Sequence, residues 1–161
     1  MPRGPRCLRR SGSDLSSLRY TLRSGGLSLT IRAIIPPEFR AVADQVKMSP
    51  AIVSGNHVFL TGVTGVDHLN GTMPEVPGDQ FRNAFETIGS ILRAGGLTFR
   101  SIVEMTTYHV GLREHFGTFD AIRLEYLGDP YPAWTAVEVA GLRREGAVVE
   151  IRIVASTEPD D

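Results

Sequence analysis

Short strand-type runs alternate with helix-type patterns between residues 51 and 155, and this order constrains the fold more than any other feature of the chain. Two strands come first, followed by a helix, a strand, a second helix and two final strands. A strand that is followed by a helix and another strand needs a crossover, which implies parallel pairing, whereas hairpins supply antiparallel pairing. The pattern therefore predicts an α+β protein with a mixed β-sheet and both helices packed on one face.

A hairpin and a helix give the strongest local signals. The runs Ala51–Ser54 and Val58–Thr61 are joined through Gly55-Asn56, which is typical of a tight β-hairpin turn. Between Asp79 and Ala94 apolar residues recur at spacings of 4, 3 and 4 residues before Gly95-Gly96, so we expect one buried helical stripe. The residues of this stripe are Phe81, Phe85, Ile88 and Leu92.

The remaining patterns complete the predicted sheet. Residues 101–110, 134–139 and 148–155 have strand-type composition. A second helix is expected over residues 114–127, and its inward side chains would be Phe116, Phe119, Ile122 and Tyr126. Apolar strand residues would then remain for another subunit to cover, which predicts an oligomer. These residues are Val137, Val139, Val149, Ile151 and Ile153.

The formal net charge of −1 averages two unlike segments. Residues 1–32 contain seven arginines and one acidic residue, a net charge of +6, whereas the rest contains ten basic and seventeen acidic residues, a net charge of −7. We expect residues 1–28 to be a basic, disordered leader, residues 29–156 to be a single α+β domain that opens with a strand, and residues 157–161 to be an acidic tail. A translated upstream sequence, a transit-type peptide and a nucleic-acid-binding arm are alternatives for the leader.

Several classes of protein are excluded or disfavoured. No apolar run approaches the roughly 18 residues of a membrane span, so we expect a soluble, cytoplasmic protein. The single cysteine, Cys7, allows neither an internal disulfide nor a thiolate zinc site, and the four histidines show no metal-ligand spacing. We therefore expect no metal and no cofactor. The negative charge of the folded part also argues against nucleic acid as a partner.

Three segments could carry chemistry, and each has a structural alternative. Glu150 interrupts an apolar run, so it either faces solvent or is a cleft carboxylate that orients water as a general base. The stretch Gly62–Gly65 is either a flexible strand exit or a source of backbone N–H donors beside a cleft. Trp134, the only tryptophan, is either core packing or a flat wall for a ligand.

These segments together resemble the Rid family, also called YjgF/RidA or endoribonuclease L-PSP-like. The resemblance covers about Met48 to Ala155, and it implies a chorismate-mutase-like α+β protomer and a homotrimer with small-molecule clefts between subunits. It also implies hydrolysis of 2-imino or enamine acids to 2-keto acids without metal or organic cofactor. The motifs that carry the resemblance are Phe59-Leu60-Thr61-Gly62, Gly95-Gly96-Leu97, Ile102-Val103-Glu104-Met105-Thr106-Thr107, Pro132-Ala133-Trp134-Thr135-Ala136-Val137-Glu138-Val139-Ala140 and Val149-Glu150-Ile151.

The chain departs from this family at the substrate-binding positions. In the deaminases an arginine follows the Pro-Ala pair and grips the substrate carboxylate, but this chain has Trp134 there. Arg123, where relatives often have tyrosine, is a possible substitute, and Asp120 stands where an asparagine is common. Glu150 matches the acid that positions the hydrolytic water. The family's Ser-Gly-Gln is replaced by Thr61-Gly62-Val63, which keeps a hydroxyl.

The resemblance implies Glu150 and Thr61 as catalytic residues and Gly62, Trp134, Asp120 and Arg123 as substrate-binding residues. Two functions follow. The first is a homotrimeric, deaminase-like hydrolase of imine, enamine or related carbonyl metabolites other than simple 2-imino acids. The alternative is a non-catalytic trimer that binds a small molecule or regulates. RNA binding or cleavage, which the older family name suggests, is disfavoured by the charge.

Overall fold

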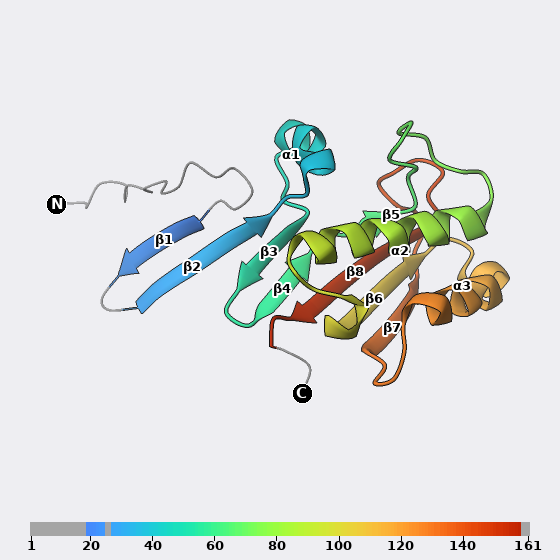
Figure 1. The fold of residues 1–161 in the computed structure, drawn as a ribbon. Helices are drawn as coiled ribbons and strands as arrows, with labels where there is room; N and C mark the ends of the chain where they lie inside the picture. Colours follow the sequence, from blue (N-terminus) through green and yellow to red (C-terminus); the bar gives the residue numbers. More distant parts are fainter. Residues whose placement is uncertain (1–18, 25–26, 159–161) are drawn as a thin grey trace.

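The computed structural model describes residues 19–24 and 27–158, with side chains from Ile31 onward. Three α-helices and two 3-10 turns lie beside eight strands (Figure 1). The helical elements are η1 (Pro37–Phe39), α1 (Arg40–Val46), α2 (Pro77–Ala94), η2 (Phe99–Ser101) and α3 (Leu112–Tyr126). The strands are β1 (Arg19–Ser24), β2 (Leu27–Ile34), β3 (Ala51–Ser54), β4 (His57–Leu60), β5 (Val63–Thr64), β6 (Ile102–His109), β7 (Ala133–Glu138) and β8 (Val149–Ser156).

One mixed sheet contains all of these strands. Its order is β1-β2-β3-β4-β8-β6-β7, and β5 pairs with β8 off this path. Strands β6 and β7, which the crossover helix α3 connects, are parallel, and the other pairs are antiparallel. The predicted α+β fold with a mixed sheet is therefore confirmed, and the short helix α1 is an addition to the two predicted helices.

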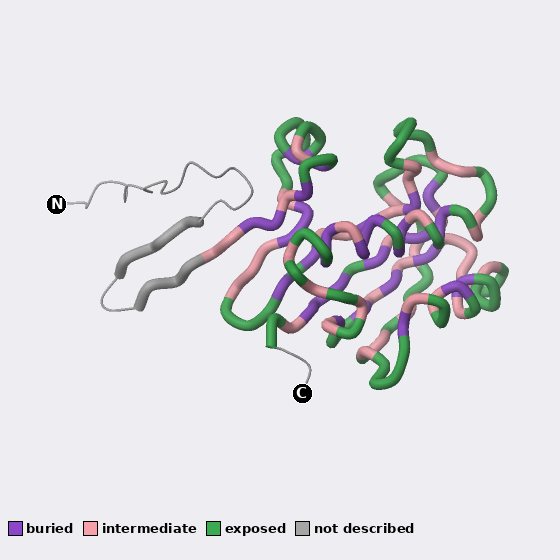
Figure 2. Tube along the Cα trace, viewed as in Figure 1, coloured by how far each residue is buried: buried purple, intermediate pink, exposed green. Residues whose placement is uncertain are grey.

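The helices α2 and α3 lie over one face of the sheet (Figure 1). The predicted stripe of α2 is the centre of the core, because Phe81, Phe85, Ile88 and Leu92 are each at most 1% exposed. Buried positions gather along α2 and the strands behind it (Figure 2). The 4-3-4 spacing therefore identified the buried face of this helix correctly.

Strand β8 packs against these helices with every second residue. Val149, Ile151 and Ile153 are fully buried in the same cluster as the α2 stripe, so the expectation that another subunit covers them was wrong. They alternate with Glu150 and Arg152, which project from the opposite face. That face carries exposed apolar side chains that α2 and α3 do not cover: Phe59 at 40%, Val103 at 44% and Val137 at 38%.

Helix α3 follows its prediction only in part. Phe119 and Ile122 are buried, and Tyr126 is partly buried and stacks on Phe85 with ring centroids 4.9 Å apart. Phe116 was predicted to face inward but is 41% exposed. It lies beside β7, which is the edge strand of the sheet, so no strand in the described part of the chain lies beyond β7 to cover it.

The sheet begins earlier in the chain than the sequence indicated. Strand β2 starts at Leu27, and β1 lies within the segment that was predicted to be a leader. β1 pairs with residues 27–32 of β2, whereas only Ile31–Ile34 of β2 pair with β3. The rest of the predicted leader, residues 1–18, and the last three residues of the acidic tail lie outside the described residues.

Candidate functional site

The first group of predicted site residues, here called the Glu150 group, consists of Thr61, Gly62 and Glu150. Glu150 lies in β8, where it pairs with Tyr108 of β6 on one side and Thr64 of β5 on the other. Its carboxylate lies directly against Gly62, so that a Cβ atom at residue 62 would overlap Oε1 and lie 2.8 Å from the carboxyl carbon. Glycine at this position therefore makes room for the acid.

Hydrogen bonds fix the direction of the Thr61 hydroxyl. The Thr61 N–H donates to the Pro50 carbonyl oxygen at 3.0 Å, and Thr61 Oγ1 donates to Met48 Sδ at 3.0 Å. In this orientation the hydroxyl donates to the sulfur, and the lone pairs of Oγ1 can accept a further hydrogen bond. Sequence analysis did not identify the role of Met48.

The stretch that follows Gly62 is a short strand and not an open loop. Val63 and Thr64 form β5 and pair with Ile151 and Glu150. Gly65 then lets the chain pass closely over α2, because a Cβ atom there would overlap backbone atoms of Gln80. The strand exit and the first turn of α2 are therefore tightly packed.

Gln80 fixes the loops around this strand exit, a role that sequence analysis missed. Its buried amide donates to the carbonyl oxygens of Pro74 at 2.7 Å and Gly146 at 2.9 Å and accepts from the Val148 N–H at 2.9 Å. A polar residue inside an otherwise apolar helix face is the signal that could have identified it. Through these bonds α2 holds the entry into β8, which carries Glu150.

The second group, here called the Trp134 group, consists of Phe116, Asp120, Arg123 and Trp134. The indole Nε1–H of Trp134 donates to Thr107 Oγ1 at 3.0 Å. Phe116 stacks parallel to the indole at a centroid distance of 5.9 Å, and the Arg123 guanidinium carbon lies 4.3 Å from the centroid of the indole ring. Trp134 is therefore packed between β6 and α3 with a cation on its ring.

The charge of Arg123 is neutralised within this group. Its Nε and Nη2 both donate to Oδ1 of Asp120, at 3.0 and 2.6 Å. The Arg123 side chain is only 13% exposed, whereas that of Asp120 is 36% exposed. The guanidinium is thus engaged by a carboxylate and an aromatic ring, and it is not a free clamp for a substrate anion.

The two groups project from opposite faces of the sheet. Trp134 pairs with Met105, which pairs with Ile153 on the helix-facing side. Glu150 pairs with Tyr108 on the other side. Residues that are paired across a sheet share a face, and neighbours along a strand alternate. The structure therefore places the Glu150 carboxylate against Gly62, the residue that follows Thr61, and it brings Asp120, Arg123 and Trp134 together, but it does not join the two groups within one protomer.

The N-terminus of α3 is held to β7 by Glu138. The carboxylate of Glu138 accepts hydrogen bonds from the N–H groups of Gly111 at 2.9 Å and Leu112 at 2.6 Å.

His109, in β6, is buried beside the Trp134 group. It is 1% exposed, and neither of its ring nitrogens has a hydrogen-bond partner among the described residues. Its burial lowers the pKa of the imidazole. Phe119 packs edge-on against His109 and also contacts Trp134, so this part of the core supports the Trp134 group.

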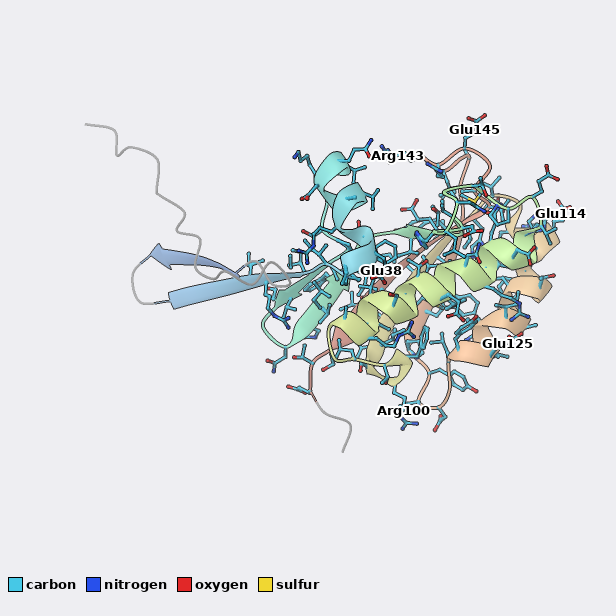
Figure 3. All side chains as sticks on the ribbon, turned by 45° about the horizontal axis from the view of Figure 1, so that its top comes forward. Glu38, Arg100, Glu114, Glu125, Arg143 and Glu145 are labelled. Carbon is cyan, nitrogen blue, oxygen red and sulfur yellow. The ribbon has the colours of Figure 1, made fainter. Side chains whose placement is uncertain are left out.

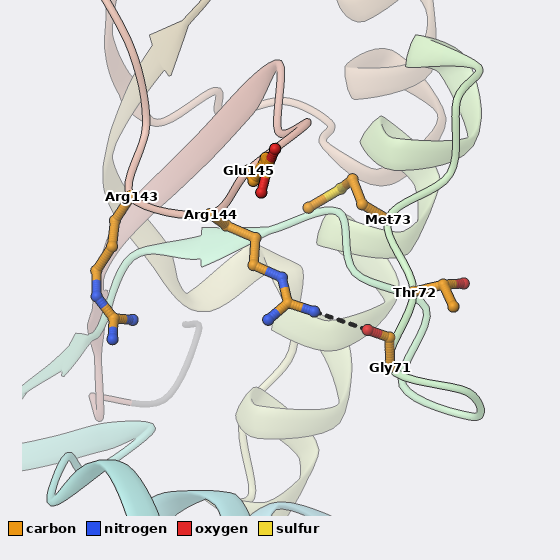
Figure 4. A pocket seen from close by; sticks show the side chains of 6 residues that line it. All are labelled: Gly71, Thr72, Met73, Arg143, Arg144 and Glu145. Atoms are coloured by element: carbon orange, nitrogen blue, oxygen red, sulfur yellow. Dashed lines mark hydrogen bonds between the residues drawn. The ribbon is translucent and has the colours of Figure 1, made fainter.

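A separate hollow of about 540 Å³ lies between two loops and contains none of the predicted site residues (Figure 4). Arg144 crosses it and donates from Nη2 to the Gly71 carbonyl oxygen at 2.7 Å. Its lining is Gly71, Thr72, Met73, Arg143, Arg144 and Glu145.

In the described part of the chain, no cluster of three or more His, Cys, Asp or Glu side chains is placed to hold a metal ion. The helices there are also too short or too polar to span a membrane.

The fold and the two groups define an α+β protein with an acid–glycine pair on one sheet face and an aromatic–arginine cluster on the other. A comparison with protein families assigns it further. The sequence model of the family described as endoribonuclease L-PSP matches residues 40–157. The chain belongs to this family, and the predicted Rid membership is confirmed.

Known relatives agree with this assignment. The chain is 32% identical over 124 residues to the RutC family protein YjgH of Escherichia coli, covering 76% of this chain and 92% of that protein. It is 31% identical over 136 residues to the mouse 2-iminobutanoate/2-iminopropanoate deaminase, covering 83% and 97%. The solved structure of YjgH matches with a TM-score of 0.71 at 30% identity, covering 80% and 97%, which confirms the predicted YjgF/L-PSP fold.

A further similar structure was solved with a bound amino acid. Escherichia coli TdcF with bound serine matches with a TM-score of 0.62 at 28% identity, covering 67% of this chain and 86% of that one. The proteins that this chain resembles therefore include one named as an imine deaminase and one whose structure was solved with bound serine.

Proposed function

We propose that this chain is a deaminase-like hydrolase of imines or enamines that lack a carboxylate on the imine carbon. Similarity to the 2-iminobutanoate/2-iminopropanoate deaminase supports the reaction type. We expect a substrate range different from that of the 2-imino acid deaminases because of the state of Arg123. Its guanidinium is bound to Asp120 and stacked on Trp134. A 2-imino acid needs an unpaired cation for its carboxylate, and the Trp134 group supplies none.

The proposed functional unit is a homotrimer with clefts between subunits. A cleft that contains both groups requires two copies of the chain, since the groups lie on opposite faces of one sheet. The sheet face that α2 and α3 do not cover offers exposed Phe59, Val103 and Val137 for such an interface. The mass measured under native conditions tests this assembly, and a monomer would contradict it.

Glu150 is the proposed general base. A water oxygen bonds to the imine carbon while the Glu150 carboxylate takes one water proton, and the C=N electron pair moves to nitrogen. Glu150 then passes this proton to the nitrogen, which gives a neutral carbinolamine. As its C–N bond breaks, the bonding electron pair and the hydroxyl proton go to the nitrogen, so that ammonia leaves and the carbonyl forms. One imine and one water thus give one carbonyl compound and one ammonia, with no metal or cofactor. Thr61 would hold the water or the imine nitrogen through the lone pairs of Oγ1.

Paired substrates test this proposal. An amine oxidase generates imines without a carboxylate, an amino-acid oxidase generates 2-imino acids, and ammonia release is measured above the spontaneous rate. We expect the wild type to accelerate only the first class. Glu150→Gln should lower that rate by about 10²–10⁴-fold, and Trp134→Arg should raise activity on 2-imino acids by about tenfold or more because it restores a bidentate cation.

Two outcomes would contradict the proposal in different ways. Equal acceleration of both substrate classes by the wild type would show that Trp134 does not alter the substrate range. Binding of ligands without acceleration of any imine would favour the non-catalytic binding trimer. The cytoplasmic location and the absence of a nucleic-acid partner stay predictions.

A further inference from the structure

We propose that the site selects a cationic or hydrogen-bond-donating group next to an apolar or aromatic body, such as a protonated imine, and that it rejects anions. This inference deepens the proposed function and rests on it. It follows from the direction of the hydrogen bonds in both groups of side chains.

The Glu150 group presents acceptors. In the structure the Thr61 hydroxyl donates to Met48 Sδ, and in this orientation the lone pairs of Oγ1 are left to accept a hydrogen bond from a ligand. The neighbouring Glu150 carboxylate, placed against Gly62, is an acceptor as well. A ligand nitrogen that bears protons matches both oxygen atoms, whereas a carboxylate would face two acceptors.

The Trp134 group presents aromatic rings and a carboxylate. Phe116 is 41% exposed, and Asp120 is 36% exposed and takes both bonds from Arg123 on Oδ1. The guanidinium charge is cancelled by Asp120, so the group has no net positive charge to attract an anion. The pair is neutral as a whole, but its carboxylate is the more exposed partner, so an approaching ligand meets the Asp120 carboxylate and the Phe116 ring first, which favours a cation.

The same preference suits the chemistry. Protonation of an imine nitrogen draws electrons from the C=N bond and makes the carbon a better target for water. A site that binds the protonated form therefore binds the reactive form. Such a ligand would be held by charge and by ring stacking, and a carboxylate on it would add repulsion from Asp120 and Glu150.

Trp134 supplies the measurement, because it is the only tryptophan in the chain and lies within the site. Its fluorescence is titrated at neutral pH and low salt with benzylammonium chloride, sodium benzoate and benzyl alcohol, which share one aromatic body and differ in charge. We expect benzylammonium to bind at least about tenfold more tightly than benzoate. Added salt should weaken this binding.

Two variants of the ion pair should shift the preference in opposite directions. Asp120→Asn frees the guanidinium, so benzylammonium should bind roughly two- to fivefold more weakly and benzoate more tightly. Arg123→Gln frees the carboxylate, so benzylammonium should bind more tightly by a similar factor. Glu125→Gln is the matched control, because Glu125 lies on the same helix (Figure 3). Its partner is Arg82, which does not belong to the Trp134 group. It should leave all three titrations unchanged.

Several results would overturn the inference. Benzoate binding as tightly as benzylammonium, no fluorescence response to any probe, or the same shift in both ion-pair variants would each contradict it. The results also distinguish a failure of the proposed enzyme activity from a failure of the inferred selectivity. Cation-selective binding without imine hydrolysis contradicts only the enzyme, whereas imine hydrolysis together with a preference for benzoate contradicts only the selectivity. Circular dichroism of each variant shows that the comparison is between folded proteins.

Discussion

The Glu150 group and the Trp134 group belong to one sheet but are held in different ways. Glu150 lies on β8, which has paired strands on both sides, so backbone hydrogen bonds fix its position. Trp134 lies on β7 at the edge of the sheet, and side chains of α3 fix its position. Side chains at this edge can therefore be exchanged without moving the acid on β8.

Removing Phe119 should have the largest effect, and on the Trp134 group in particular. Its ring is fully buried and contacts Phe81, His109 and Trp134. Phe119→Ala should lower the free energy of unfolding by about 3–5 kcal/mol because it leaves a large cavity, as denaturant unfolding would measure. Leu124→Ala, on the same helix but 48% exposed, should change it by less than about 0.5 kcal/mol. Equal losses would show that α3 does not depend on this contact.

Gly62→Ala, in the Glu150 group, should lower the rate of imine hydrolysis strongly and change the free energy of unfolding only slightly. The new methyl group displaces the flexible end of Glu150, so imine hydrolysis should fall by about 100-fold, while the free energy of unfolding should change by about 1 kcal/mol or less. Shortening the acid makes room again, and Gly62→Ala combined with Glu150→Asp should therefore recover part of the rate. Gly128→Ala, where a Cβ meets nothing within 4 Å, is the control. Full activity of Gly62→Ala would show that the position of Glu150 is unimportant.

The hydrogen bond between Trp134 and Thr107 should have a moderate effect. Trp134→Phe leaves the buried Thr107 hydroxyl without this donor, so the free energy of unfolding should fall by about 1–3 kcal/mol. In a double-mutant cycle, Thr107→Val should cost much less in the Trp134→Phe background than in the wild type. Additive losses in thermal unfolding would mean that the bond contributes no stability.

The smallest expected effect is a dependence of stability on pH through His109. Burial lowers the pKa of this imidazole in the folded state, so the unfolded chain binds the proton more readily. The free energy of unfolding should therefore fall as the pH drops below the ordinary histidine pKa of about 6.5, by less than about 1.4 kcal/mol per pH unit for this one group.

A variant isolates the contribution of His109 from that of His68, whose pKa is also lowered by desolvation. His109→Leu should make the fall in stability between roughly pH 7 and roughly pH 5 shallower, whereas the acid response due to His68 remains. Urea unfolding at several pH values provides the measurement. An unchanged slope would show that His109 does not contribute to the acid sensitivity.

Several features of the fold were predictable because their signals are local. The stripe of α2 and the turn at Gly55-Asn56 appear in the sequence as spacing and turn chemistry, and both are present in the structure. Helix α1 was missed because it has seven residues and only one of them is buried. Strand β5 was missed because two residues have no period, and only their pairing with β8 makes them a strand.

The candidate site was predictable as a set of residues but not as an arrangement. Motif and composition identified Glu150, Gly62 and Trp134, since these residues stand out in their own segments. Their faces depend on strand pairing across long stretches of chain, and one-residue alternation along β7 and β8 places Trp134 and Glu150 on opposite sides. The same limitation explains Phe116, whose spacing suits a buried stripe although the sheet ends beside it.

The sequence by itself determined the order of strands and helices, the main buried helical face and the family of this protein. Backbone periodicity and turn chemistry act over a few residues, so they are visible without a structure. The tertiary structure decided which strands are neighbours, and with that the separation of the two groups, the contact of Gly62 with Glu150 and the stacking of Arg123 on Trp134. These depend on contacts between segments far apart in the chain, and only the packed fold brings such segments within reach of one another.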